Sequence, residues 1–260
     1  MSLVKDLYEP HVLPARARLK TDAALRRLVD PSISPELLER FFIQWNSLGV
    51  FMTEPVEGWI RRAGERCVAL GLEKVGRSLV MHARHEAGHH LMMIEDVKHL
   101  VQGWNARRSP PLDSARLLAQ MPTDAMRAYR KLHEDVIASA MPAGQVAIEF
   151  EIENLSVVLL PSLLGNVERV LGKDFLAKLS FMQEHAEIDV GHTALNEKML
   201  GDLLTLMPEN AEALADIGSR ALDIYVRFLT ECLEAAEDAL RASTPTTAEA
   251  VPAAPRVSAH

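Results

Sequence analysis

Cysteine is scarce in this chain of 260 residues. The two cysteines, Cys67 and Cys232, lie far apart and form no C-x-x-C pair. This spacing excludes a fold held together by disulfide bonds, and it excludes a zinc site built from thiolates. It also fits a reducing compartment, and we therefore expect the protein in the cytoplasm.

Long hydrophobic runs and an excess of basic residues are also missing. No stretch approaches the roughly 18 consecutive apolar residues of a membrane-spanning helix, and residues 1–20 lack the apolar core of a secretory signal. The 28 lysines and arginines are outnumbered by 36 aspartates and glutamates, which gives a net charge of −8. A nucleic-acid-binding surface is basic, so we expect neither a nucleic acid nor a membrane as partner.

Strand signals are scarce as well. Aromatic residues make up 5% of the chain, and leucine, alanine, glutamate, arginine and methionine dominate over β-branched runs. Because these residues favour helices, the sequence predicts an all-α protein. The length suits one large domain, which we place at residues 1–242. Residues 243–260 are rich in proline, alanine and threonine without periodicity, which is typical of a disordered tail.

Capping residues and prolines divide the chain into helices. Ser34-Pro35 is typical of a helix start, since serine caps the first N–H groups and proline suits the first turn. Thr123-Asp124 is a second such start, and Pro142-Ala143-Gly144 marks a break. The sequence predicts about seven helices in one bundle, with long segments at 73–104, 124–140, 145–170, 174–204 and 209–242.

The most informative segment is EHAEIDVGH, which begins at Glu184. A helix turns by about 100° per residue, so His185, Asp189 and His192 fall within an arc of about 60° on one helix face. The neighbouring Phe181 indicates that this face points inward. Two imidazoles and a carboxylate on one face supply half of a metal coordination set, although a solvated face with an Asp–His pair gives the same pattern.

A second cluster lies in the segment MHARHEAGHH. Glu86 and His89 form an E-x-x-H pair on the predicted helix 73–104, which is a recurring device of carboxylate-bridged di-iron bundles. His90 is an alternative to His89, because residues four apart also share a helix face. The pair also arises by chance in helices rich in glutamate and histidine. Three histidines neighbour this face and could orient the ligands by hydrogen bonds: His82, His85 and His90.

A third cluster consists of glutamates in the apolar segment AIEFEIENLS. Glu149 and Glu153 share a helix face, whereas Glu151 points away from it. An unpaired charge in apolar surroundings is costly, so an inward carboxylate needs a cation or a metal ion as partner. We expect Glu149 to be this ligand, with Glu153 as its replacement or as an additional ligand. Glu151 is expected at a solvated surface.

Together, the three segments supply three carboxylates and three imidazoles. Zinc sites take four ligands, so six ligands are too many for one zinc ion. Nitrogen and oxygen ligands without thiolate suit iron or manganese, and two ions can share bridging carboxylates. The sequence therefore predicts a dinuclear non-haem site that serves to activate O2.

The H-x-x-x-D-x-x-H run of residues 185–192 resembles the last core helix of the haem-oxygenase-like di-iron oxidases and oxygenases. The order and spacing of the other two clusters are similar to that family, and the segment through Ser156 looks most like its alkene-forming fatty-acid decarboxylases. The resemblance implies a seven-helix haem-oxygenase-like bundle, two iron ions as cofactors and O2 as co-substrate. It implies six metal ligands: Glu86, His89, Glu149, His185, Asp189 and His192.

The same resemblance implies an oxidoreductase that acts on a small aliphatic acid or an amino-acid-derived substrate, with an external electron donor as a further partner. The reaction would be oxidative decarboxylation, desaturation, N-oxygenation or C–C cleavage. Arg84 would bind a substrate carboxylate if it faced the cavity, but an exposed arginine on a helix edge gives the same pattern. Apolar faces left over on long helices suit a homodimer. Five residues could line an adaptable apolar pocket: Met92, Met93, Phe150, Leu159 and Met182.

Other functions fit the same bundle. Thiamin-degrading enzymes use this fold without metal, through a cysteine or glutamate and aromatic stacking, but in this sequence no tryptophan or tyrosine lies near the glutamate cluster. A non-catalytic helical binding protein would use the polar clusters only for structure. Haem held by a single histidine would leave the inward carboxylates without a role. Counting bound iron separates these alternatives.

Overall fold

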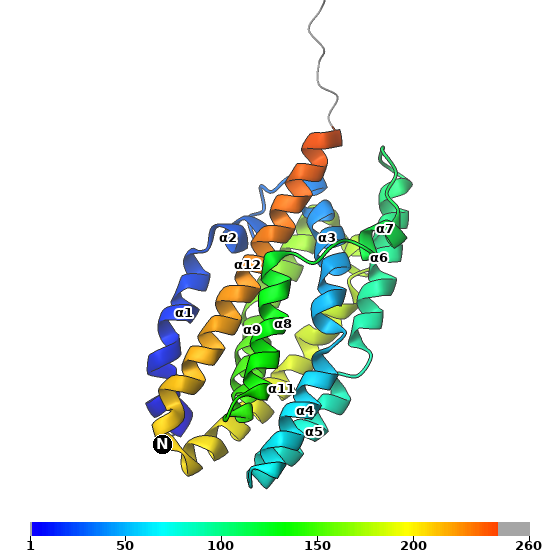
Figure 1. Ribbon diagram of the computed structural model, residues 1–260. Coiled ribbons are helices and arrows are strands. Elements are labelled where there is room, and N and C mark those ends of the chain that lie inside the picture. Colours follow the sequence, from blue (N-terminus) through cyan, green and yellow to red (C-terminus); the bar gives the residue numbers. More distant parts are fainter. Residues whose placement is uncertain (1, 244–260) are drawn as a thin grey trace, which may run out of the picture.

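The computed structural model describes residues 2–243, and all regular structure in this range is helical (Figure 1). The predicted all-α class is thereby confirmed. The predicted number of seven helices is too low, because these residues form twelve α-helices, of which two have only four or five residues. The tail predicted for residues 243–260 lies outside the described residues, apart from Ser243 at the end of the last helix.

The chain begins with a short π-helical turn, Val4–Tyr8, that continues into the first α-helix. In chain order the α-helices are α1 (Glu9–Thr21), α2 (Ala23–Leu28), α3 (Pro35–Thr53), α4 (Val56–Ala69), α5 (Glu73–His85), α6 (His89–Asn105), α7 (Ser114–Leu118), α8 (Asp124–Ala138), α9 (Gln145–Leu171), α10 (Lys173–Leu176), α11 (Ser180–Leu206) and α12 (Ala211–Ser243). Short 3-10 turns, Pro142–Gly144 and Pro208–Asn210, precede α9 and α12, so the prolines interrupt the chain where the sequence predicts.

Two predicted helix starts are confirmed, and a glycine marks the end of another helix. The Ser34 hydroxyl accepts a hydrogen bond from the Leu37 N–H at the start of α3. The Thr123 hydroxyl accepts one from the Met126 N–H at the start of α8. At the far end of α9, Gly172 has φ +87°, a conformation that ends a right-handed helix. These boundaries depend only on neighbouring residues.

The helix predicted at 73–104 is in fact two helices, and the break lies inside the E-x-x-H pair. α5 ends at His85, and α6 begins at His89. Between them Gly88 has φ +88°, which glycine adopts without the strain that a Cβ would cause. Glu86 therefore caps α5 while His89 opens α6, so the pair spans a turn instead of sharing one helix face.

The helix α9 occupies the interior of the bundle. It packs against α11 and α12, and Figure 1 shows it behind α8 and α12. Helix α1 runs along α12, α3 packs on α6, and α4 and α5 form a close pair. In that pair, a Cβ on Gly64 would lie only 2.7 Å from the Gly76 carbonyl oxygen. Because residues 145–151 of α9 are all buried, every polar side chain among them needs a partner.

Glu151 anchors α1 to α9. Its buried carboxylate accepts two hydrogen bonds from the Arg16 guanidinium, both at 2.8 Å, and one from the Tyr8 hydroxyl at 3.0 Å. The predicted exposure of Glu151 is therefore wrong, because α1 covers this face of α9. A bidentate guanidinium is a strong partner for a buried carboxylate.

Both cysteines are free thiols, in agreement with their spacing, and both are buried. Within the part of the chain that the structure describes, no helix combines the length and the apolarity needed to cross a bilayer.

Candidate metal centre

Helices α5, α6, α9 and α11 bring histidine and carboxylate side chains together inside the bundle. These side chains form two groups, and the ligand atoms of each group lie within 4.8 Å of one another. Glu86 belongs to both groups. The first group contains His82, Glu86, Glu153 and His192, and the second contains Glu86, His89 and His185.

In the first group, both imidazoles face carboxylate oxygens. His82 Nε2 lies 3.0 Å from Glu153 Oε1 and 3.5 Å from Glu86 Oε1. His192 Nδ1 lies 3.2 Å from Glu86 Oε1 and 3.8 Å from Glu153 Oε1. Asp189 Oδ1 is 3.6 Å from the same nitrogen of His192. Nitrogen and oxygen atoms from three helices thus converge on one small region.

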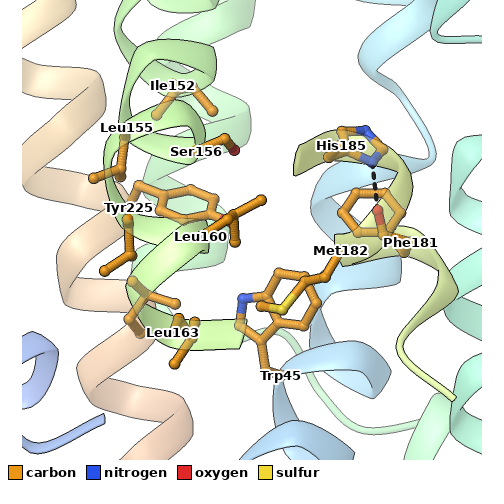
Figure 2. Close-up of a pocket in the computed structure, with 12 residues that line it drawn as sticks. Trp45, Ile152, Leu155, Ser156, Leu160, Leu163, Phe181, Met182, His185 and Tyr225 are labelled. Carbon is orange, nitrogen blue, oxygen red and sulfur yellow. Dashed lines mark hydrogen bonds between the residues drawn. The ribbon is translucent and has the colours of Figure 1, made fainter. Parts of the chain in front are cut away.

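In the second group, His89 Nδ1 lies 3.1 Å from Glu86 Oε2. The ring of His185 meets the ring of His89 edge-on, with centroids 4.8 Å apart. Figure 2 shows that His185 Nδ1 faces the Phe181 carbonyl oxygen, at 2.8 Å. A carbonyl only accepts hydrogen bonds, so Nδ1 carries the proton, and Nε2 keeps its lone pair for a metal ion.

Glu86 connects the two groups through its two oxygens. Oε1 faces His82 and His192, whereas Oε2 faces His89. A carboxylate that presents each oxygen to a different set of imidazoles can bridge two metal ions. The position of Glu86 at the end of α5, directly before the turn at Gly88, aims it at both sets.

One nitrogen of the first group, His82 Nδ1, is buried without a hydrogen bond among residues 2–243. Buried polar atoms are nearly always paired, and an orphaned one costs roughly 1–3 kcal/mol. Three further buried atoms, His82 Nε2, His192 Nδ1 and Asp189 Oδ1, contact only other histidine and carboxylate groups of the cluster. Nitrogen and oxygen atoms that face one another in this way fit a bound cation. Without thiolates among them, the donor set suits iron or manganese.

The charges of the first group compensate one another. Burial alone would lower the pKa of His82, but the Glu153 and Glu86 carboxylates outweigh burial and raise it to about 10. Burial alone would raise the pKa of Glu86, but hydrogen bonds from His82 and His89 hold it well below its usual range. In the metal-free chain, protonated His82 therefore balances these carboxylates. A metal ion that binds here would take over this charge and displace the proton.

Glu149, expected to be a ligand, lies outside both groups. Its buried carboxyl group accepts a hydrogen bond from Gln145 Nε2 at 2.5 Å, and burial together with the Glu153 charge raises its pKa to about 8. Glu153, one turn later, faces the histidines instead. The geometry therefore favours the alternative glutamate. Both residues lie on one face of α9, so their spacing alone could not separate them.

The histidines of the E-x-x-H segment take different positions. His89 belongs to the second group, whereas its alternative, His90, belongs to neither. His82, expected only to orient other ligands, is itself a member of the first group. Its spacing of four residues from Glu86 was the signal that could have placed it there. His85 is exposed.

Two adjacent cavities adjoin the candidate metal centre. The first, of about 90 Å³, is lined by His185 and by four carboxyl groups, those of Glu86, Glu149, Glu153 and Asp189. The second, of about 40 Å³, has mostly apolar walls from α3, α9, α11 and α12 (Figure 2). Both share five lining residues: Ile152, Ser156, Phe181, His185 and Tyr225. A polar cavity thus continues into an apolar one, which suits a substrate with an aliphatic part.

The predicted pocket residues lie in two different environments. Leu159 and Met182 line the apolar cavity. Met92, Met93 and Phe150 line neither cavity. Arg84 is exposed and lines neither cavity, so it does not face the site.

Two tyrosines lie at the carboxylate cavity although they are distant from the glutamates in the sequence. Tyr129 comes from α8 and Tyr225 from α12, and their ring centroids are 6.3 Å apart. The glutamates therefore have aromatic neighbours in the fold, although no tryptophan or tyrosine lies near them in the sequence.

Comparisons with known proteins identify structural neighbours only. No protein-family model matches the sequence, and no curated protein matches it. A domain of unknown function with a haem-oxygenase-like fold from Shewanella denitrificans superposes with a TM-score of 0.70 at 17% identity, covering 94% of this chain and 96% of that chain. A TenA homolog from Pseudomonas syringae pv. tomato gives a TM-score of 0.66 at 15% identity, covering 90% and 93%. A CADD-like protein of unknown function from Nostoc punctiforme gives 0.59 at 14% identity, covering 87% and 97%.

At these identities the matches establish the fold alone. The chain has a haem-oxygenase-like fold, as the resemblance of its motifs implied. Because one fold hosts unrelated functions, the function has to be argued from the site.

Proposed function

We propose that this protein is a non-haem di-iron oxidoreductase that activates O2 and oxidises a small aliphatic acid or an amino-acid-derived substrate. The observation that carries the proposal is the position of Glu86. Its two oxygens face two separate sets of histidines inside the bundle, as expected of a carboxylate shared by two ions.

In this proposal, Glu86 would help to hold both iron ions. His82, Glu153 and His192 would hold the first ion, and His89 and His185 would hold the second. Asp189, beside His192, is the remaining carboxylate of the site. Compared with the six ligands that the resemblance implies, Glu153 replaces Glu149, and His82 is added. When bound, iron supplies the one-electron and O2 chemistry that side chains lack.

The surrounding residues prepare the site for this use. The hydrogen bond from His185 Nδ1 to the Phe181 carbonyl fixes the ring orientation and leaves Nε2 available. The raised pKa of Glu149 keeps this carboxyl group largely neutral at pH 7, so it adds little negative charge to the cavity. The apolar cavity beside the centre holds the aliphatic part of the substrate away from water.

The proposal includes oxidative decarboxylation, desaturation, N-oxygenation and C–C cleavage as reaction types. O2 takes up four electrons when it is fully reduced to water, whereas desaturation of a substrate supplies two. An external electron donor is therefore part of the proposal wherever the substrate supplies fewer than four electrons.

Anaerobic titration of the metal-free protein with Fe(II) tests the proposal. We expect two iron ions per chain to remain after gel filtration. A pulse of O2 with a series of aliphatic acids and amino acids should then give oxidised products that mass spectrometry detects. A chain that retains no iron, or an iron-loaded chain that consumes no O2 with any of these compounds, would contradict the proposal.

A metal-free enzyme on the same fold is the alternative, and the match to a TenA homolog is the observation that favours it. A cysteine nucleophile reacts as the thiolate, yet burial raises the pKa of Cys67 to about 11 and that of Cys232 far above its usual range. Neither cysteine lines the two cavities at the carboxylates. This alternative, like a non-catalytic binding protein, predicts that no iron is retained.

A further inference from the structure

A third cavity lies on the outer side of α9. It is a groove of about 310 Å³ between α1, α9 and α12. Much of its wall is apolar, and two of its apolar residues, Leu13 and Val158, are 52% and 66% exposed. Exposed apolar side chains that line one hollow mark a surface that binds something apolar.

The groove also carries positive charge in a chain whose net charge is −8. Arg16, Lys20 and the acidic Glu151 line it, so Lys20 supplies its excess positive charge. The guanidinium of Arg16 is held by Glu151. Lys20 is exposed and forms no ion pair with any residue of the described range 2–243. A free ammonium group beside an apolar groove is complementary to an amphiphile with an anionic end.

Leu155 separates this groove from the interior. It lines both the groove and the apolar cavity, and no other residue between 2 and 243 does so. Its side chain is only 4% exposed, and Figure 2 shows it pointing from α9 away from His185. A leucine can change rotamer without any movement of the backbone. Displacement of this one side chain would therefore join the groove to the apolar cavity and, through Tyr225 and Ile152, to the carboxylate cavity.

The charges along these three cavities are ordered. Lys20 lies at the outer groove, the middle cavity is mostly apolar, and four carboxyl groups line the inner cavity. A carboxylate that passed through the apolar cavity would lose its hydration without gaining a partner, which is costly. An amphiphilic acid is therefore bound most favourably with its carboxylate outside, at Lys20, and its apolar end inside.

We propose that Leu155 gates a substrate route between α1 and α9, and that an amphiphilic aliphatic acid enters it with the apolar end first while Lys20 holds its carboxylate. The carbon atoms that reach the candidate metal centre are then those distant from the carboxylate. For the reaction, this inference rests on the proposed function. It limits the reaction to the carbon atoms at the apolar end of the substrate, as in desaturation. Binding itself does not depend on iron.

Bromine, a contact quencher of tryptophan fluorescence, tests the orientation in the metal-free protein. Trp45 lines the apolar cavity. We expect 12-bromododecanoic acid to quench its fluorescence and 2-bromododecanoic acid to quench it much less. In Trp45→Phe the difference between the two acids should disappear. Equal or stronger quenching by the 2-bromo acid would overturn the proposed orientation.

Stopped-flow binding of 12-bromododecanoic acid tests the gate. Leu155→Trp should slow association about tenfold or more, the effect of a barrier higher by about 1.4 kcal/mol. Leu155→Ala should raise the association and dissociation rates together, with a nearly unchanged Kd, whereas a purely structural role would change Kd or stability without this pattern. Leu70→Trp is the matched control, because Leu70 is exposed and lines none of the three cavities. Unchanged association in Leu155→Trp, or equal slowing in Leu70→Trp and Leu155→Trp, would contradict the gate.

The neutral analogue 12-bromododecan-1-ol tests the role of Lys20. Lys20→Glu should weaken binding of the acid about two- to fivefold, as expected for an exposed ion pair, and leave binding of the alcohol unchanged. If Lys20→Glu weakened binding of the acid and of the alcohol equally, Lys20 would not contact the carboxylate. Failure to bind either ligand, together with a dimer in gel filtration that Leu13→Asp dissociates, would assign the groove to a second copy of the chain. Because all of these measurements use metal-free protein, their outcome is independent of the iron count.

Discussion

Glu86 Oε1 lies 3.2 Å from His192 Nδ1, so the end of α5 meets the middle of α11 at the candidate metal centre. The other oxygen of the same carboxylate lies 3.1 Å from His89 Nδ1 at the start of α6. One side chain thus joins two sets of imidazoles, and the proposed site depends on it more than on any single histidine.

Replacement of Glu86 should affect both halves of the site. In Glu86→Ala we expect iron binding to fall from two ions per chain to less than one, because each proposed ion loses an anionic ligand. His89→Ala should remove one ion preferentially. Glu187→Ala is a matched control, since Glu187 is an exposed glutamate on α11. Iron analysis after anaerobic loading measures all three variants, and full occupancy in Glu86→Ala would argue against a bridging role.

Gly88 should be required for the geometry of the site as well as for stability. Its φ of +88° is strained for alanine, so Gly88→Ala should cost about 1–2 kcal/mol of unfolding free energy. The strain should also shift Glu86 relative to His89 and lower iron occupancy. Gly71→Ala is the matched control: its φ is +84°, a Cβ there meets nothing within 4 Å, and it lies away from the site.

Urea unfolding of the metal-free variants measures the loss of unfolding free energy, and iron analysis measures how much iron each variant binds. Similar losses of stability are expected for both glycine variants, with loss of iron only in Gly88→Ala. Equal iron occupancy in the two variants would show that the backbone turn at Gly88 is not needed for iron binding.

The buried ion pair between Arg16 and Glu151 should be far more sensitive than an exposed one on the same helix. Arg16→Leu leaves a fully buried carboxylate without its cation, which should cost about 3 kcal/mol. Arg18→Leu breaks the exposed pair with Asp223 and should cost less than about 1 kcal/mol. Urea unfolding at pH 7 compares them. The double variant Arg16→Leu/Glu151→Leu should recover part of the loss, whereas a further loss would contradict this account.

His133 should make the metal-free protein less stable in acid. Its ring is fully buried, stacks on Trp59 at 4.0 Å and contacts Gln145, and burial lowers its pKa to about 3. The unfolded chain takes up this proton near pH 6.5 and the folded chain only near pH 3. The contribution of His133 to folding stability is therefore constant above pH 6.5 and falls by up to about 1.4 kcal/mol per pH unit as the pH drops from there towards 3.

The dependence of unfolding free energy on pH between 6.5 and 5 measures this effect. His133→Gln should lower the slope of unfolding free energy against pH by up to about 1.4 kcal/mol per pH unit, whatever its effect on absolute stability. His99→Gln, which changes an exposed histidine of α6, should leave the slope unchanged. Identical slopes in His133→Gln and the unaltered protein would show that this imidazole is not kept neutral by burial.

Much of the fold could be predicted because its signals are local. Ser34 and Thr123 cap helices as expected, and Gly172 ends α9. The break at Gly88 was missed, because a single glycine is also tolerated inside a helix. Helix number was predicted too low for the same reason, since short turns such as this one carry few sequence signals.

The site could be predicted only as far as helix periodicity reaches. The spacing of His185, Asp189 and His192 places them on one face of α11, and all three lie at the carboxylate cluster. Periodicity gives the direction in which a side chain points around its helix. It does not give the residue of another helix that lies opposite that side chain. It therefore could not choose Glu153 over Glu149, nor bring Tyr225 to the cavity.

The sequence by itself determined the all-α class, most helix ends and the three polar clusters, because each depends on residues within one or two turns of one another. Only the tertiary structure decided which members of those clusters meet. Glu151 shows the physical reason: its burial depends on Arg16, 135 residues earlier in the chain, and no local pattern encodes which distant helix will cover a given face.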